Sequence, residues 1–126
     1  NKNSDTPLHK ASQWGTLDVV KYLIEQKGVD VDIRNDYGDT PLHRAAQYGH
    51  NDLITYLISE RNALVNPVDV DGWTPAHQAA NNGKKEAYDL LLKFGADMTM
   101  KTSLTSGSVP ENRGKTPLEV LNRVMG

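Results

Sequence analysis

The sequence predicts an all-α solenoid of stacked helix–turn–helix units, and three observations support this. A Thr-Pro tetrapeptide begins at positions 6, 40, 74 and 116, at intervals of 34, 34 and 42 residues. A glycine follows each of the first three threonines nine residues later, and a segment of helical apolar periodicity follows each of those glycines. A fixed period of this length is typical of stacked supersecondary units that share one elongated core.

The tetrapeptide predicts the start of the first helix in each unit. Threonine at a helix N-cap accepts a hydrogen bond from a free backbone N–H, and proline suits the first helical position. The glycine nine residues later supplies the left-handed residue that ends a two-turn helix. In the first copy these signals place a helix from about Pro7 to Trp14.

The apolar segments after the glycines predict a second helix in each unit. They cover Leu17–Ile24, Leu53–Ile58 and Ala87–Leu92, and the first of these helices should end near Gln26. An exit led by glycine or asparagine follows at 28–32, 62–66 and 95–99. In the first two copies one extra residue precedes this exit, compared with the third copy.

Thr-Pro-Leu-His-x-Ala at 40–45, the glycine at 49, the leucine-rich second helix and the exit together resemble the ankyrin repeat. The resemblance covers almost the whole chain and implies an ankyrin-repeat solenoid with projecting β-turn connections, called fingers below. We expect repeats at about 1–34, 35–68 and 69–101. An insertion should follow at about 102–110, and a partial or capping repeat at about 111–126. We expect residues 102–112, rich in Ser, Thr and Gly, to be more mobile than the fingers.

Composition excludes several function classes. The chain has 126 residues, a net charge of −2 and no cysteine, which removes disulfides, thiolate metal sites and cysteine nucleophiles. The charge gives no general attraction to nucleic acid. No run approaches the ~18 apolar residues of a membrane span, so we expect no membrane insertion. We expect an intracellular, cytoplasmic protein, and we interpret the sequence as a fragment because it begins partway along a repeat.

The four histidines all fall at repeat positions. The resemblance implies that His9, His43 and His77 bridge to threonine and to neighbouring backbone. Units stacked ~10 Å apart cannot bring them around one ion. We expect no metal, no cofactor and, without a catalytic motif, no enzyme. The resemblance leaves Asn66 either as a turn residue, which we favour, or as a site of asparagine hydroxylation.

The resemblance implies that the concave groove and the fingers bind a partner. The predicted groove residues lie seven and eight positions after each threonine: Gln13, Trp14, Gln47, Tyr48, Asn81 and Asn82. The predicted finger residues are Asp36, Tyr37, Asp39, Asp71, Trp73 and Arg113. Aromatic residues usually dominate interface energetics. Trp73 has the alternative of packing against the next finger, and Tyr22, Tyr56 and Tyr88 are expected to pack.

The sequence therefore predicts a protein–protein interaction module, and we expect it to be monomeric. The aspartates of the first two inter-repeat connections favour a basic partner built around an apolar anchor. One alternative is a non-catalytic regulatory or targeting segment of a larger enzyme or channel. Another is an array that binds a small ligand such as a nucleotide, but its candidate cations, Lys10, Arg44 and Lys84, are scattered along the sequence.

Overall fold

The computed structural model describes residues 5–102 and 114–125, and every regular element in these ranges is a helix. The α-helices are α1 (Pro7–Trp14), α2 (Leu17–Glu25), α3 (Pro41–Gln47), α4 (Asn51–Thr55), α5 (Pro75–Asn81), α6 (Lys85–Lys93) and α7 (Pro117–Met125). A π-helix, η1 (Tyr56–Glu60), continues α4. The predicted all-α class is confirmed.

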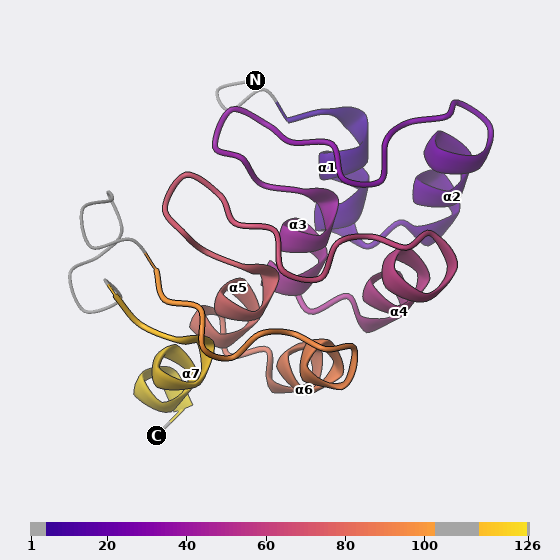
Figure 1. Ribbon diagram of the computed structural model, residues 1–126. Coiled ribbons are helices and arrows are strands. Elements are labelled where there is room, and N and C mark those ends of the chain that lie inside the picture. The colour runs from indigo at the N-terminus through magenta and orange to yellow at the C-terminus, as the bar shows by residue number, and fades with distance from the viewer. Residues whose placement is uncertain (1–4, 103–113, 126) are drawn as a thin grey trace.

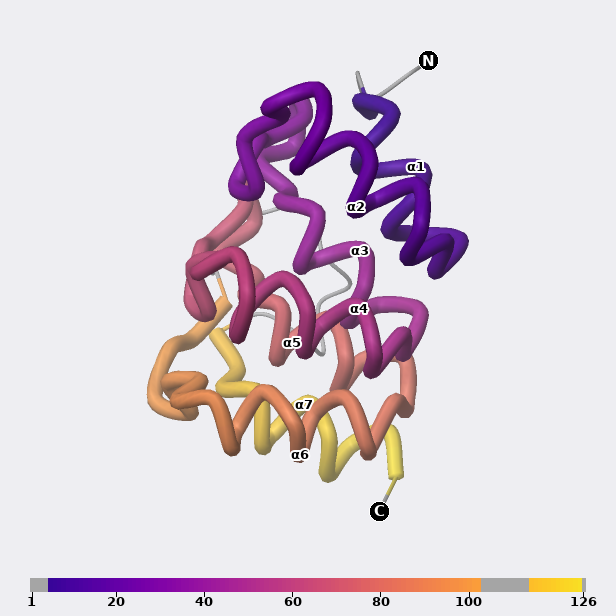
Figure 2. Tube along the Cα trace, turned by 90° about the vertical axis from the view of Figure 1, so that its right-hand side faces the viewer, coloured from indigo at the N-terminus to yellow at the C-terminus, as the bar shows by residue number. Residues whose placement is uncertain are grey.

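The helices form two layers (Figures 1 and 2). The first helices of the units, α1, α3, α5 and α7, pack side by side in chain order, while α2, α4 and α6 form a second layer beside them, on the right in Figure 1. Each first helix through α5 also packs on the second helix that follows it. The connections 27–39 and 61–73 project beyond the first layer as the two fingers that the structure describes (Figure 1).

Each first helix begins with the predicted threonine cap. The hydroxyls of Thr6, Thr40 and Thr74 accept from the backbone N–H three residues later, and the histidine at that position accepts from the threonine N–H. In the fourth copy a glutamate takes the histidine's place. Thr116 N donates to Glu119 Oε1 at 3.0 Å, and Glu119 N donates to Thr116 Oγ1 at 3.3 Å. The divergent fourth copy therefore keeps a reciprocal cap.

Two observations explain why the residue that ends α1, at position 15, is a glycine. Its φ of 72° is left-handed, and a Cβ atom there would lie 2.5 Å from the imidazole of His50. His50 comes this close because its Nε2 bonds the carbonyl oxygen of Gln13 at 2.7 Å. The glycine thus ends one helix and admits a side chain of the next repeat.

The extra residue of the first two copies lies where the sequence places it, at the end of the second helix. Val29 N and Ala63 N each bond a carbonyl six residues back, whereas Ala96 N bonds one five residues back. In the second copy the helix also widens into η1, and Asn62 follows with a left-handed φ of 56°. The extra residue of the longer period is therefore accommodated in the turn at the end of the second helix.

The core runs along the stack between the layers. Leu8, Leu42 and Ala76 occupy equivalent positions and are at most 1% exposed. Alanines at 45, 46, 79 and 80 are completely buried where α3 packs against α5. Small side chains let helix axes approach closely, as expected from the sequence. Val120 and Leu121 of α7 close this core at the other end of the described stack.

The predicted insertion at 102–110 lies almost entirely outside the described residues. The expected mobility of residues 102–112 therefore stays a prediction. Thr102 is buried, and its backbone N–H donates to the carbonyl oxygen of Lys115 at 3.0 Å. The repeat boundaries remain predictions.

Candidate functional site

Three histidines join each repeat to the next. Nδ1 of each accepts from the threonine N–H of its own cap. The Nε2–H of His9 therefore donates to Asp39 O, that of His43 to Trp73 O and that of His77 to Lys115 O, at 2.7–2.8 Å. The bridging role implied by the resemblance is confirmed. Each acceptor is the residue before the next repeat's threonine.

Burial keeps these histidines neutral. It lowers the pKa of His43 to about 4, against a weaker opposing effect of the hydrogen bond to Trp73 O. Burial likewise lowers the pKa of His9 and of His77. With both ring nitrogens engaged, these side chains have a structural role and no free lone pair for proton transfer.

A hollow of about 350 Å³ lies between the fingers and the first-helix layer. It is lined by Tyr37, Asp39, Arg44, Gln47, Asp69, Asp71 and Gln78. Four of these residues, Tyr37, Asp39, Gln47 and Asp71, were predicted to contact a partner. The structure therefore gathers one third of the predicted site around a single concavity.

The aromatic residues of the predicted site differ in exposure. Trp14, Tyr37 and Tyr48 are 70%, 52% and 40% exposed. Trp73 is only 6% exposed and lies tilted against the ring of His77, with centroids 5.8 Å apart. Trp73 therefore packs within the chain, on the His77 ring of its own repeat and not on the next finger as the alternative had it, and its burial disfavours the predicted partner contact.

The tyrosines of the second helices also differ in exposure. Tyr56 and Tyr88 are buried as expected, but Tyr22 is 51% exposed, so its predicted packing is wrong. Tyr56 lies against the preceding repeat, with its hydroxyl 2.6 Å from Glu25 Oε2 and Lys21 Nζ over its ring. Among the described residues no earlier repeat stands beside Tyr22 to cover it in the same way.

The remaining predicted residues are polar and partly engaged within the chain. Gln13 Oε1 accepts from Arg44 Nη1 at 3.2 Å, and Asn81 Oδ1 accepts from Arg123 Nη2 at 3.2 Å. Asn82 is exposed and donates to the carbonyl oxygen of Gln78. Asp36 is also exposed. Arg113 lies outside the described residues.

Sequence reasoning left Arg44 and Gln78 out of the site and counted Asp69 only among the acidic residues of the connections that favour a basic partner. Arg44 and Gln78 share one register, four residues after a threonine, and that register faces the hollow. Arg44 Nη2 lies 3.0 Å from Asp5 Oδ1, so this cation is paired across repeats. Aligning the copies by register would have found the two first-helix residues. Their inward direction required the stacked structure.

One group in the described part of the chain has the spacing of a metal site. Ligand atoms of Asp39, His43 and Asp69 lie within 4.8 Å of one another. Both nitrogens of His43 are already bonded, to Thr40 and to Trp73 O. The two remaining carboxylates are fewer ligands than protein-bound zinc or calcium takes.

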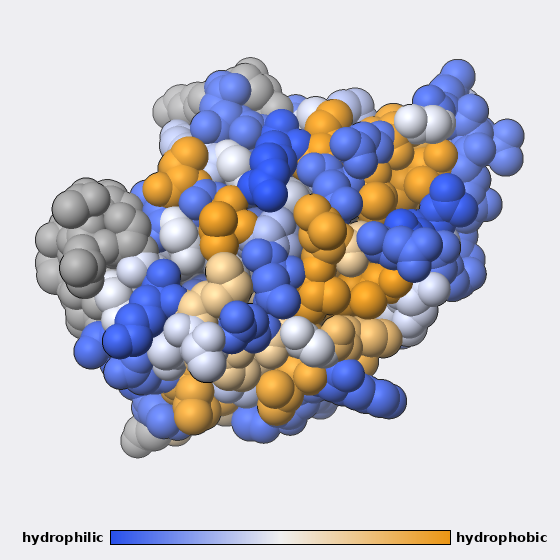
Figure 3. All heavy atoms as spheres, in the orientation of Figure 1, coloured by the Kyte–Doolittle hydropathy of each residue, from blue (hydrophilic) through white to orange (hydrophobic). Residues whose placement is uncertain are grey.

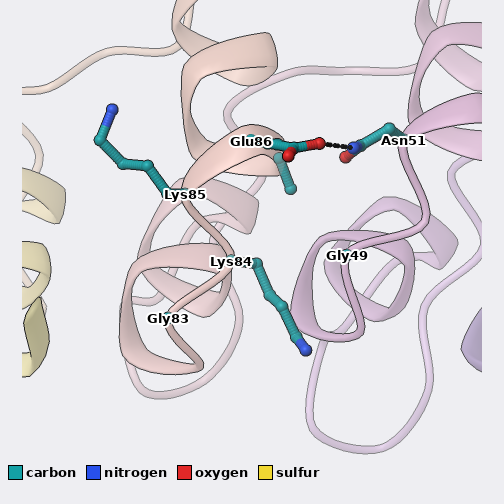
Figure 4. A pocket seen from close by; sticks show the side chains of 7 residues that line it. Gly49, Asn51, Gly83, Lys84, Lys85 and Glu86 are labelled. Atoms are coloured by element: carbon teal, nitrogen blue, oxygen red, sulfur yellow. Dashed lines mark hydrogen bonds between the residues drawn. The ribbon is translucent and has the colours of Figure 1, made fainter.

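A second hollow, of about 300 Å³, lies away from the fingers between the starts of α4 and α6 (Figure 4). Asn51 Nδ2 donates to Glu86 Oε2 across it at 3.3 Å. Lys84 extends toward Gly49, where an added Cβ would lie 3.0 Å from its Cδ. Lys84 and Arg44 thus line different hollows.

Asn66 joins two successive connections. Its Oδ1 accepts from Asp97 N at 2.8 Å, and its Nδ2 donates to Gly95 O at 3.4 Å. These bonds support the turn role that the sequence favours for this residue.

No helix within 5–102 or 114–125 has the length and apolar character needed to cross a membrane. Residues 1–69 match the family described as "Ankyrin repeats (3 copies)", and residues 71–103 match "Ankyrin repeat". The chain belongs to the ankyrin-repeat family. Ankyrin repeats generally act as protein–protein interaction modules and are generally non-catalytic.

Two curated relatives are each similar to this ankyrin-repeat chain over a segment about as long as one repeat. Alpha-latrotoxin-Lt1a of Latrodectus tredecimguttatus is 53% identical over 38 residues, which are 30% of this chain. Alpha-latrotoxin-Lh1a of Latrodectus hasselti is 54% identical over 35 residues, or 28% of this chain. The matched segments span only 3% and 2% of those toxins.

Proposed function

We propose that this ankyrin-repeat chain binds a partner protein or peptide on the surface between its fingers and its first helices. The observation that supports this most directly is the exposure of Trp14, Tyr37 and Tyr48. Trp14 and Tyr48 occupy the same register of successive repeats, and Tyr37 stands on the finger between them. Large exposed aromatic side chains are typical of interface anchors.

The partner we propose is basic around an apolar anchor. Asp36 is exposed beside Tyr37, and Asp71 lines the concavity with it. Arg44, the cation of the same concavity, is already paired with Asp5. Lys or Arg side chains of a partner would approach these carboxylates, and such complementary charge chiefly raises the association rate and the specificity.

We further propose that the chain acts as a non-catalytic monomer inside the cell. The engaged histidines support the first point, and the absence of cysteine fits a reducing compartment. Such repeats also occur within much longer polypeptides, as the short matches to the latrotoxins illustrate, so a regulatory or targeting role in a larger protein is compatible with this binding function. Sedimentation equilibrium tests the monomer, and cell fractionation tests the location.

A pull-down with the intact chain and three variants tests the binding surface. Trp14→Ala combined with Tyr48→Ala should lose the partners that mass spectrometry finds with the unmodified chain. Tyr22→Ala is the matched control, because it removes an equally large exposed aromatic from the second-helix layer. Circular dichroism must first confirm that each variant is folded.

If the double variant keeps every partner, the proposed surface is wrong. Binding would then lie on another face. Leu64, Val68 and Val70 offer exposed apolar area along the connection 61–73, and Figure 3 shows apolar residues gathered among the connections on the face viewed there. Val70→Asp is the third variant, and loss of all partners with it alone would favour that alternative.

A further inference from the structure

Two successive fingers meet through the side chains of Asp39 and Asp69. Oxygen atoms of the two carboxyl groups lie within 4.8 Å of each other. Oδ1 of Asp39 is buried, and no donor group of the described residues reaches it. Two ionised carboxylates offer only acceptors. A proton on one of the two carboxyl groups would supply the donor that this buried contact otherwise lacks.

The preceding pair of repeats contains the same contact with a different donor. Asp5 and Asn35 stand 34 residues before Asp39 and Asp69. There the side-chain amide of Asn35 donates from Nδ2 to Oδ1 of Asp5 at 2.7 Å. The Asn35 contact needs no titratable proton, because an amide carries its own donor.

Asn35 and Asp69 also shape their fingers identically. Asn35 Oδ1 accepts from the backbone N–H groups two and four residues later, at 2.9 and 3.0 Å. Asp69 Oδ1 accepts from the backbone N–H groups of Asp71 and Trp73 at the same two distances. The substitution of aspartate for asparagine therefore keeps the finger and changes only the donor that faces the preceding repeat.

We propose that Asp39 and Asp69 share one proton that joins the second and third repeats, and that its loss at rising pH weakens this joint. Asp39 carries the proton, because the two backbone N–H bonds to Asp69 stabilise the ionised form of Asp69. Burial, the hydrogen bond to Asp69 and the negative charge of Asp69 together raise the pKa of Asp39 to about 7.

The surroundings of the pair are mixed in charge. The titratable and charged groups that face it or act on it are Asp5, His9, Arg34, His43, Arg44 and Asp71. Arg44 favours ionisation of Asp39, but its guanidinium is held by Asp5 and Gln13. The carboxyl groups of Asp5 and Asp71 oppose ionisation of the pair.

The shared proton and the buried histidines change the stability of the fold with pH in opposite directions. A folded-state pKa raised from about 4 to about 7 means that the folded chain holds a proton that the unfolded chain has released. The stabilisation is complete below about pH 4 and is lost as the pH rises to about 7. The buried histidines act in the opposite direction over this range, so the pair must be measured by itself.

Carbon-13 NMR of the aspartate side chains of the unmodified chain makes that measurement. We expect one carboxyl of the pair to titrate near pH 7. Titration of both carboxyl groups below about pH 5 would overturn the proposal, and this result requires no variant.

Asp69→Asn provides the second test, because it restores the amide donor that Asn35 supplies one repeat earlier. Its thermal midpoint relative to that of the unmodified chain should rise between pH 5 and pH 8, and the pKa of Asp39 should be lower in this variant, because the two effects of Asp69 that raise it are removed. Asp36→Asn, an exposed carboxylate on the neighbouring finger, is the matched control and should show no such rise. A midpoint difference that is the same at both pH values would contradict the shared proton.

Discussion

His43 donates from Nε2 to the main-chain carbonyl oxygen of Trp73 at 2.8 Å and so ties the second repeat to the third. Its ring is 1% exposed, and its other nitrogen accepts from the backbone N–H of Thr40. One neutral side chain therefore satisfies a helix start and the end of the following finger. A charged ring would lose the acceptor that the cap requires.

Replacing His43 by alanine should strongly destabilise the array. The change leaves a cavity and removes the partners of a buried N–H and a buried carbonyl, for which we expect a loss of about 2–4 kcal/mol in the free energy of unfolding. Urea denaturation measures it. His50→Ala, at a partly exposed ring with one backbone bond, should lose clearly less; equal losses would count against the special role of the buried bridge.

The same histidine should make stability depend on pH. Burial lowers the pKa of folded His43 to about 4, so below about 6.5 the unfolded chain binds the proton more readily. Its contribution is complete above about pH 6.5 and is lost as the pH falls to about 4, by about 3 kcal/mol in total. Nitrogen-15 NMR should find a neutral ring protonated on Nε2 at pH 6; a charged ring at that pH would disprove the prediction.

Binding kinetics should separate the aromatic anchors from the charged rim. Tyr48→Ala should weaken binding of a partner identified by pull-down by about 1–3 kcal/mol, mainly through faster dissociation. Surface plasmon resonance measures both rates. Tyr22→Ala serves again as the matched aromatic control and should leave both rates unchanged.

Asp36→Asn should chiefly lower the association rate. The side chain is exposed on the finger, so its charge should steer the encounter and contribute little to the bound state. We expect slower association, a weaker dependence of association on salt and an almost unchanged dissociation rate. A change confined to dissociation would instead place Asp36 inside the contact.

Substitutions at Asn62 test the left-handed backbone conformation that accommodates the extra residue of the second repeat. It is left-handed, with φ of 56°, and stands where the first and third copies have glycine. Asn62→Ala should lower the free energy of unfolding by about 1 kcal/mol, because alanine lacks the local bonds that help asparagine adopt this conformation. Asn62→Gly should change it by less than about 0.5 kcal/mol. Equal losses would indicate that a side-chain contact, not backbone conformation, matters there.

The helix starts could be read from the sequence because they depend on neighbours. A threonine, a proline and a residue three positions after the threonine suffice for the cap, and even the Glu119 variant obeys the same short-range rule. The position of the extra residue was also predictable, since it changes the length of one hydrogen-bonded turn and leaves the next repeat in register.

The exposure of aromatic residues could not be read from register alone. Tyr22 and Tyr56 share a position, yet only Tyr56 has a preceding repeat against which to pack among the described residues. Trp73 lies against His77 of its own helix start, whereas Trp14 at the end of α1 has little to cover it. Burial is a property of the packed neighbours, which a repeat motif does not encode.

The sequence by itself determined the solenoid and the threonine caps, because the caps depend on residues close in the chain and the period fixes the stacking. The bridging histidines followed from the resemblance to the ankyrin repeat. Only the tertiary structure decided that Asp39 meets Asp69 and that Arg44 pairs with Asp5. These partners lie 30 or more residues apart, and their charges interact only after stacking has removed them from water, where the interaction becomes strong enough to hold a proton or a cation in place.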